Sequence, residues 1–426
     1  MKKKGKKRLV RLPILAVGTA VMLFSGIIYA WSILNVPFRI IELADGSEVI
    51  MNSAQLGINY SLLLVFFCLG NFSSGLMSKQ TSVRLRFILS GMLLIASFYL
   101  SSLHVVTLQY TQNYFMLVMA YAMLGGLGIG MTYNTVVSTV TMWYPEKRGF
   151  SSGILLMSFG LSALIVGSLV NLMGQSEAIG WRNTYVTLAF VLGGVLLLAA
   201  IVIKPPPSNT LLPEPKSDVS RNAHESDGEV PEAKKSYSTR EMIRRPSFIL
   251  IFIYITFLTM SGSVAIGFGS EIVYDVGGAE TIAVIAVGMI GIFNGAGRLI
   301  CGALFDKAGI RQTQLLSSAI AILAPLVVVT AITADSLLLG VVGLSLCGLT
   351  FGFAPTTGSV FASEFYGTKN FAQNFSILGL ILIPASFSAA LAGTIRAASG
   401  SFMIAFIILT ALAVAGFFIN LGIRKP

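Results

Sequence analysis

Arg298 is a basic residue placed well inside an apolar stretch, Gly291-Ile-Phe-Asn294-Gly-Ala-Gly297-Arg298-Leu-Ile-Cys-Gly302. It lies four residues before Gly302, or about 6 Å along a helix. An arginine in such surroundings normally faces a partner or an aqueous cavity, because an unpaired buried charge is costly. The long apolar stretches hold no Asp or Glu well inside them. Arg298 is therefore suited to hold an anionic ligand through charge-assisted hydrogen bonds, and Asn294 lies one turn away on the same face.

Two structural roles for Arg298 stay open beside this one. Its long side chain could extend to the nearby membrane surface, or it could bond to backbone carbonyls of a neighbouring helix.

The composition indicates that these residues belong to a membrane protein. Of the 426 residues, 55% are hydrophobic and 11% are charged, whereas a typical soluble domain is about 25% charged. About 20 apolar residues span the hydrocarbon core, and such stretches form helices because backbone groups in lipid must bond internally. Twelve stretches fit: 13–35, 56–78, 85–104, 113–140, 149–173, 183–203, 248–270, 281–304, 312–333, 336–356, 371–395 and 401–421.

A polar segment divides the spans into two sets of six. Residues 204–247 begin with Lys204-Pro205-Pro206-Pro207 and contain few large apolar residues, which is typical of a flexible linker. We therefore expect an all-α membrane protein with a basic tail over 1–12, a six-helix bundle over 13–203, the linker over 204–247, a second six-helix bundle over 248–421 and a tail over 422–426.

The basic residues indicate the orientation of the chain. The net charge is +11, and 25 of the 29 Lys and Arg fall in the tails, the linker and the connections on one side of the predicted spans. Because basic residues gather on the cytoplasmic side, we expect both termini in the cytoplasm of a multi-pass protein of the plasma membrane. The charge then gives no reason to expect a nucleic-acid partner. The expected surroundings are the lipid bilayer, with the chain as a monomer.

The sequence shows no pattern that predicts catalysis or a metal site. It has two histidines, His104 and His224, and neither an HExxH motif nor a GxxxxGK[ST] phosphate-binding loop. Its three cysteines, Cys68, Cys301 and Cys347, lie far apart in apolar spans. We expect no enzyme activity, no cofactor and no metal.

A loop sequence occurs once in each half. Gly302-Ala-Leu-Phe-Asp306-Lys307-Ala-Gly309-Ile-Arg311 follows the eighth span, and Gly75-Leu-Met-Ser-Lys79-Gln-Thr-Ser82-Val-Arg84 follows the second, 227 residues earlier. A repeated loop indicates that the halves share one topology. The pattern G-x-x-x-D-K/R-x-G-x-R resembles the loop signature of the major facilitator superfamily, which implies two pseudo-symmetric six-helix bundles.

The resemblance also implies a breakable charge lock between helices that move during alternating access. The second copy matches the signature at every position, but the first has Lys79 in place of the Asp and Ser82 in place of the second Gly. A carboxylate lock is thus expected only in the second half. The expected lock residues are Asp306, Arg311, Gly302, Gly309, Arg84, Glu146 and Arg148. The alternative, in which Asp306 and Arg311 only mark a structural interface, stays open.

Three further tracts resemble the oxalate/formate antiporter branch of that superfamily. They are Ser25-Gly-Ile-Ile-Tyr29-Ala-Trp31-Ser, Trp143-Tyr-Pro145-Glu146-Lys147-Arg148-Gly149 and Glu241-Met-Ile-Arg-Arg-Pro246-Ser-Phe248. The branch implies an Arg in the eighth helix that pairs with a Lys in the eleventh to hold a dicarboxylate. Arg298 matches the first of these, but residues 371–380 contain no Lys. One positive charge instead of two favours a monocarboxylate such as formate, lactate or pyruvate.

The same resemblance implies an aromatic lining for the site. Tyr29, Trp31 and Tyr133 match aromatic positions of the family motifs, and tyrosine hydroxyls can hydrogen-bond a carboxylate while the rings exclude water. Phe351 shares a helical face with Cys347 in the tenth span. The expected substrate-binding residues are Arg298, Tyr29, Tyr133, Asn294, Trp31 and Phe351, although aromatic residues in membrane helices often only pack.

The expected activity is secondary transport of a small organic anion by alternating access. The spans show no buried carboxylate or histidine relay of the kind that proton-driven transporters use. This favours exchange for a counter-anion, while proton symport stays open. The alternative function is efflux of a neutral or amphipathic solute, with Arg298 in a structural role.

Overall fold

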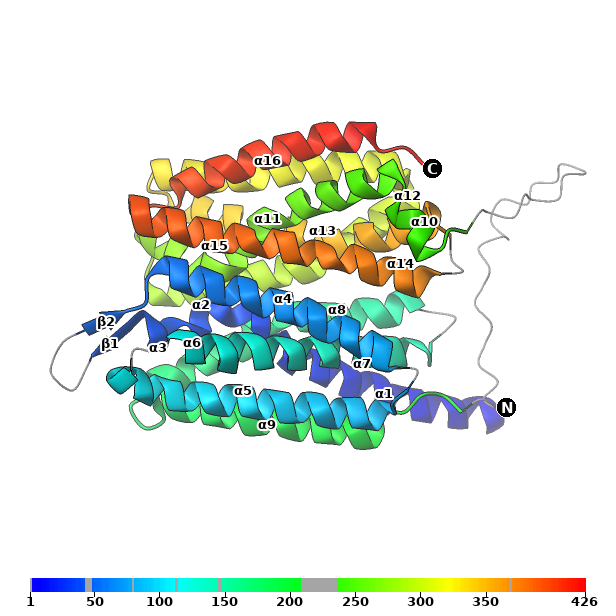
Figure 1. The fold of residues 1–426 in the computed structure, drawn as a ribbon, viewed down its shortest axis with the longest axis horizontal. Coiled ribbons are helices and arrows are strands. Elements are labelled where there is room, and N and C mark those ends of the chain that lie inside the picture. The colour runs from blue at the N-terminus through cyan, green and yellow to red at the C-terminus, as the bar shows by residue number, and fades with distance from the viewer. Residues whose placement is uncertain are drawn as a thin grey trace, which may run out of the picture.

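In the computed structural model the long apolar stretches form helices that run side by side (Figure 1). The structure describes residues 2–42, 48–78, 80–111, 114–144, 148–207, 236–367 and 370–426. Within these residues twelve helical stretches are long and apolar enough to cross a membrane, and each overlaps one predicted span. Most of the predicted linker, residues 208–235, lies outside the described residues.

The first span is interrupted. Phe38 donates its backbone N–H to Asn35, so the Leu34 carbonyl lacks its usual helical donor, and the Tyr185 hydroxyl donates to it at 2.6 Å. The elements of the first half are α1 (Lys2–Ser25), the 3₁₀ turn η1 (Gly26–Ala30), α2 (Trp31–Leu34), α3 (Val36–Arg39), the antiparallel hairpin β1 (Ile40–Glu42) and β2 (Glu48–Ile50), α4 (Ser53–Met77), α5 (Val83–Thr111), α6 (Tyr114–Leu117), the π-helical stretch η2 (Val118–Gly125), α7 (Gly126–Thr141), α8 (Arg148–Gln175) and α9 (Gly180–Val202).

The eighth and ninth spans of the second half form one long element that turns at Gly309. Its φ of 77° is left-handed, which a glycine adopts without strain. The elements are α10 (Thr239–Ile243), α11 (Pro246–Asp275), α12 (Glu280–Thr333), α13 (Leu337–Glu364), α14 (Phe371–Leu378), the 3₁₀ turn η5 (Gly379–Ile381), α15 (Leu382–Ser399) and α16 (Met403–Gly422). In the repeated loop of the first half Ser82 replaces this glycine. Asp335 is the only non-glycine residue with a positive φ in the described part of the chain. Ser82 therefore does not adopt the left-handed backbone that Gly309 adopts in the second half.

Figure 1 shows the helices of the two halves as two neighbouring bundles. Both termini lie at one end, which we call the terminal end, and the β1–β2 hairpin lies at the other, the hairpin end. The halves meet where α4 packs against α15 and where α8 packs against α12. These helices contain the second and eleventh spans and the fifth and eighth spans. A two-fold relation between the halves places the second span on the eighth and the eleventh on the fifth, so it exchanges the two contacts.

Glycines allow the two halves to approach closely at both contacts. A Cβ on Gly57 would lie 2.6 Å from the Ala389 carbonyl oxygen, and one on Gly291 would lie 2.4 Å from that of Gly160. Helices in lipid associate through such close packing, since they have no hydrophobic driving force between them.

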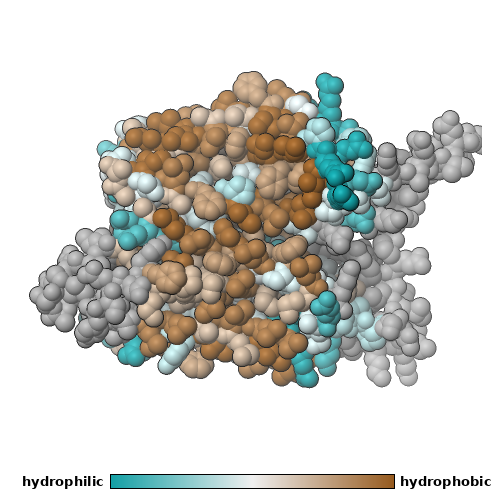
Figure 2. All heavy atoms as spheres, in the orientation of Figure 1, coloured by the Kyte–Doolittle hydropathy of each residue, from teal (hydrophilic) through white to brown (hydrophobic). Residues whose placement is uncertain are grey.

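The outer surface fits a lipid environment. On the face shown in Figure 2, hydrophobic residues form a broad band across the bundle, and hydrophilic residues gather towards its two ends. Large side chains such as Leu338, Leu172 and Phe190 are 74%, 69% and 62% exposed. A soluble monomer rarely exposes apolar patches of this extent.

Candidate substrate-binding site

Arg298 bridges the two halves of the molecule. It lies on α12 and is 7% exposed. Its Nη1 donates to the Leu156 carbonyl on α8 at 2.9 Å, and its Nη2 donates to the Tyr29 hydroxyl on η1 at 3.2 Å. Both acceptors belong to the first half. The Nε atom is buried and has no hydrogen-bond partner among the described residues.

The charge of Arg298 is not compensated by a carboxylate within the described residues. Its two acceptors are neutral oxygens, whereas Arg396 at the hairpin end pairs with Asp275 at 2.6 Å. Buried charges are normally paired, and an unpaired arginine in a membrane normally serves a ligand or faces a cavity. A negatively charged group beside Arg298 would therefore compensate its charge.

Asn294 adds a second unsatisfied polar group. It lies one turn before Arg298 on α12 and is fully buried. Neither its Nδ2 nor its Oδ1 has a hydrogen-bond partner within the described structure. A buried polar atom without a partner costs about 1–3 kcal/mol, so this amide is placed where an additional hydrogen-bonding group would stabilise it.

Aromatic rings surround the Tyr29 hydroxyl. The Tyr29 ring makes edge contacts with Phe351 of α13 and Phe159 of α8, at centroid distances of 5.8 Å and 5.2 Å. Phe159 also contacts Tyr133 of α7 at 5.4 Å, and Tyr133 lies close enough to Arg298 to interact with its charge. The structure thus brings Tyr29 and Tyr133 close to Arg298, with Phe351 packed on Tyr29, and their role as substrate contacts stays a prediction.

Two further rings of this aromatic cluster, Phe67 and Phe159, were not predicted from the sequence. Phe67 of α4 contacts Tyr133 and Phe159 at 5.5 Å and 6.3 Å. Phenylalanines are frequent in the predicted spans, and nothing in the spacing distinguishes Phe67 and Phe159 from packing residues.

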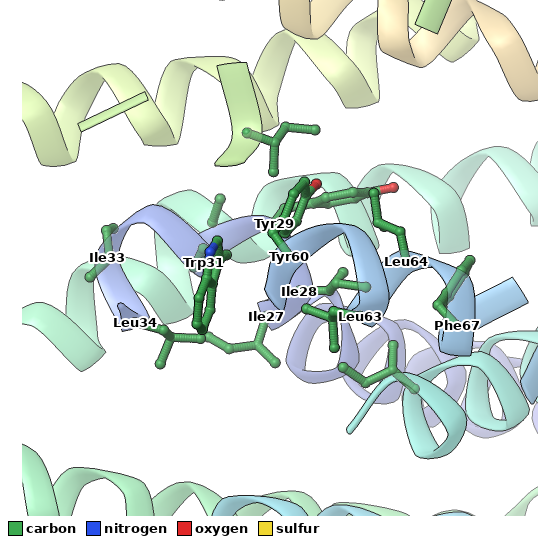
Figure 3. Packing of buried hydrophobic residues seen from close by; sticks show 14 of the residues in the cluster. Ile27, Ile28, Tyr29, Trp31, Ile33, Leu34, Tyr60, Leu63, Leu64 and Phe67 are labelled. Atoms are coloured by element: carbon green, nitrogen blue, oxygen red, sulfur yellow. The ribbon is translucent and has the colours of Figure 1, made fainter. Parts of the chain in front are cut away.

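Trp31 is not brought beside Arg298. Figure 3 shows its indole apart from Tyr29, and the ring packs against Tyr121 at 4.8 Å inside the first half. Tyr60 takes the neighbouring place, next to Tyr29 in Figure 3, with a buried hydroxyl that lacks a hydrogen-bond partner among the described residues. A contact between Trp31 and substrate stays a prediction.

The predicted lock is only partly visible. Arg311 donates from Nη1 to the Asn420 carbonyl on α16 at 3.2 Å, within its own half. Gly302 lies within α12, and Arg84 is exposed at the start of α5. Glu146 and the side chains of Asp306 and Arg148 lie outside the described residues. The lock stays a prediction.

Glutamates connect the halves at the hairpin end. Glu280 of α12 accepts hydrogen bonds from Asn171 at 3.2 Å and Gln175 at 2.8 Å, both on α8. Glu271 of α11 accepts one from the Ser53 hydroxyl of α4 at 3.2 Å. The sequence pattern had suggested no contact for these acids. The one pattern that could have indicated a contact is the pair of carboxamides, Asn171 and Gln175, one turn apart on α8.

Comparison with known proteins agrees with this architecture. The family model of the Major Facilitator Superfamily matches residues 13–382. The chain is 27% identical over 374 residues to an uncharacterized MFS-type transporter of Escherichia coli K12, YhjX, covering 85% of this chain and 83% of that protein. It is 24% identical over 255 residues to the oxalate:formate antiporter of Oxalobacter formigenes, covering 59% of this chain and 56% of that protein.

Solved structures share the fold at low identity. A bacterial homologue of the human lysosomal transporter Spinster, in an inward-facing and occupied conformation, superposes with a TM-score of 0.69 at 14% identity and covers 97% of each chain. The nucleoside transporter NupG gives a TM-score of 0.67 at 12% identity, covering 97% of this chain and 99% of that one. Because the family match runs from the first span into the eleventh and the fold is shared over nearly the whole chain, this protein belongs to the Major Facilitator Superfamily and is a multi-pass membrane transporter, not an enzyme.

Proposed function

We propose that the chain transports a small monocarboxylate that binds to Arg298 and Asn294 between the two halves. The observation that carries the proposal is the buried guanidinium of Arg298, whose partners within the described structure are two neutral oxygens. A carboxylate would supply the missing negative charge. Charge-assisted hydrogen bonds of this type are about twice as strong as neutral ones.

The surroundings favour a substrate with a single carboxylate. A carboxylate on the unsatisfied Nε of Arg298 can also accept from the Asn294 amide one turn away. The edges and faces of Tyr29, Phe159 and Phe351 exclude water around it. The eleventh span contributes no lysine over residues 371–380, so the site holds one carboxylate rather than two. The similarity to the oxalate:formate antiporter supports an anionic substrate.

Transport would proceed by rocking the two bundles, of residues 13–203 and 248–421, about this site. The glutamate hydrogen bonds and the Gly57 contact would close the hairpin end in the state described. From the distribution of basic residues, the terminal end would face the cytoplasm of a cell whose plasma membrane holds the protein. Exchange for a counter-anion fits the site better than proton symport, since the polar side chains near Arg298 in the described structure include the Asn294 amide and the Tyr29 and Thr356 hydroxyls but no carboxylate or histidine.

Counterflow in proteoliposomes tests the proposal. Purified protein would be preloaded with unlabelled formate, lactate, pyruvate or oxalate, and the uptake of labelled monocarboxylate would be followed. We expect saturable counterflow with monocarboxylates. Arg298→Ala should weaken it by about 10- to 150-fold, since a hydrogen bond to a charged group contributes about 1.5–3 kcal/mol. Arg298→Lys should retain only part of it because lysine lacks the planar fork of arginine.

Arg182→Gln is the matched control, because this arginine is exposed at the start of α9. Unchanged transport in both Arg298 variants would overturn the anion site. Preference for oxalate over monocarboxylates would overturn the substrate class.

A second candidate function is favoured by one observation. Arg298 already donates to the Leu156 carbonyl and the Tyr29 hydroxyl, which is the bonding expected of a structural arginine. In that case the chain would be an efflux transporter for a neutral or amphipathic solute. Counterflow with such solutes that Arg298→Ala leaves unchanged would support this function.

A further inference from the structure

A cavity of about 230 Å³ opens at the terminal end between the start of α11 and the end of the chain. It is lined by Arg245, Pro246, Ser247 and Leu250 on one side and by Gly422, Arg424 and Pro426 on the other. We call it the α11–α16 cavity. It lies away from the proposed substrate site, on the outside of the second bundle where two packed helices end.

The cavity has an excess of positive charge. Arg245 and Arg424 are exposed walls of it, and Arg240, Arg244 and Lys425 are exposed nearby in the sequence, against two acidic groups, the Glu241 side chain and the terminal carboxylate of Pro426. Arg245 stacks over the Tyr237 ring at 5.1 Å, which holds its guanidinium in place without neutralising it. Arg424 has no ion-pair or hydrogen-bond partner within the described residues. The start of α11 adds the partial positive charge of a long helix.

One wall of the cavity continues into the apolar surface. Leu250 lines it, and Ile249 beside it is 53% exposed. Both belong to the seventh membrane span, which begins at Pro246. Figure 2 shows hydrophilic atoms at this end of the bundle directly next to the hydrophobic band. A ligand seated here would have its charged group among arginines and its remainder along an apolar helix face.

We propose that the α11–α16 cavity binds the headgroup phosphate of an anionic phospholipid, with the acyl chains along the exposed face of α11. Two exposed guanidiniums match phosphate oxygens in charge and geometry. The position at the start of a span places the phosphate at headgroup depth. Clusters of four to eight basic residues immediately beside a membrane helix bind anionic lipids, and basic pockets between such helices bind their headgroups. A soluble phosphate shares the charged part of this chemistry but gains nothing from Leu250 and Ile249.

Native mass spectrometry of the detergent-solubilised full chain tests the site. Binding of dioleoyl phosphatidylglycerol would be titrated against dioleoyl phosphatidylcholine and, separately, against inorganic phosphate. We expect phosphatidylglycerol to bind with the highest affinity. Arg245→Gln with Arg424→Gln should weaken it by about 25-fold, from about fivefold for each arginine near the surface, and Arg245→Lys with Arg424→Lys should retain most of it.

The matched control is Lys204→Gln with Lys307→Gln, which removes two exposed charges outside the cavity. An equal loss of binding in the control would overturn the site in favour of general surface attraction. Unchanged binding in the double glutamine variant would overturn it outright. Competition by millimolar inorganic phosphate, with no preference for the lipid, would assign the cavity to a soluble anion instead. Thermal unfolding of each variant shows whether its fold is retained.

Discussion

Gly57→Ala should open the hairpin end of the protein. A Cβ at this position would lie 2.6 Å from the Ala389 carbonyl oxygen and 3.0 Å from the Phe268 ring. Both atoms belong to the second half, so the clash acts only on the contact between the halves. Distances under 3.0 Å essentially never occur for a real Cβ, and α4 and α15 must therefore separate.

The size of the effect follows from the cost of overpacking. Inserting a methyl group into a close-packed contact costs about 1–3 kcal/mol, which applies only while the hairpin end is closed. The ratio of open to closed molecules should then rise by about 5- to 150-fold, at about 1.4 kcal/mol for each factor of ten. The helix propensity gained by alanine is present in both states and cancels.

The assay is a distance measurement by electron spin resonance across the hairpin end. Labels on Glu177→Cys and Ala398→Cys report one half each, since both positions are exposed near that end, and the three native cysteines are buried. We expect a longer distance in Gly57→Ala. Gly194→Ala is the control, because nothing lies within 4 Å of its Cβ. A distance distribution in Gly57→Ala that matches the wild type would refute the assignment of this contact to the closed state.

Three further predictions concern single contacts. Glu280→Gln should have the same effect as Gly57→Ala but a smaller one. The fraction of molecules with the longer label distance should rise few-fold over the wild type, because Asn171 and Gln175 lose a charged but exposed acceptor. Tyr29→Phe should lower thermal stability and weaken counterflow, because Arg298 loses one acceptor. Counterflow should stay measurable because Arg298 keeps its charge, and its complete loss would contradict this prediction. Tyr185→Phe should lower the free energy of unfolding by about 1–3 kcal/mol, because the buried Leu34 carbonyl loses its donor. Tyr99→Phe is the control, since Tyr99 is exposed and its substitution should leave stability unchanged.

The helical spans were predictable because hydropathy is a local property. A stretch of about 20 apolar residues must be a helix wherever it lies in the bilayer, since its backbone groups have no other partners. The predicted interruption between the eighth and ninth spans also follows from a local cause, the left-handed φ that Gly309 permits. Most of the linker (residues 208–235), Glu146 and the side chain of Asp306 lie outside the described residues.

The sequence by itself determined that the chain is a twelve-span helical protein and that Arg298 is an unusual charge within it. Only the tertiary structure decided what surrounds that charge. Leu156 lies 142 residues away from Arg298 and Tyr29 lies 269 residues away, so no periodicity links them. The same holds for Phe67 and Phe159, and for Trp31, which packs on Tyr121 instead. Which side chains meet between two bundles depends on how closely their backbones approach, and glycines such as Gly57 and Gly291 set that distance through contacts that no single helix contains.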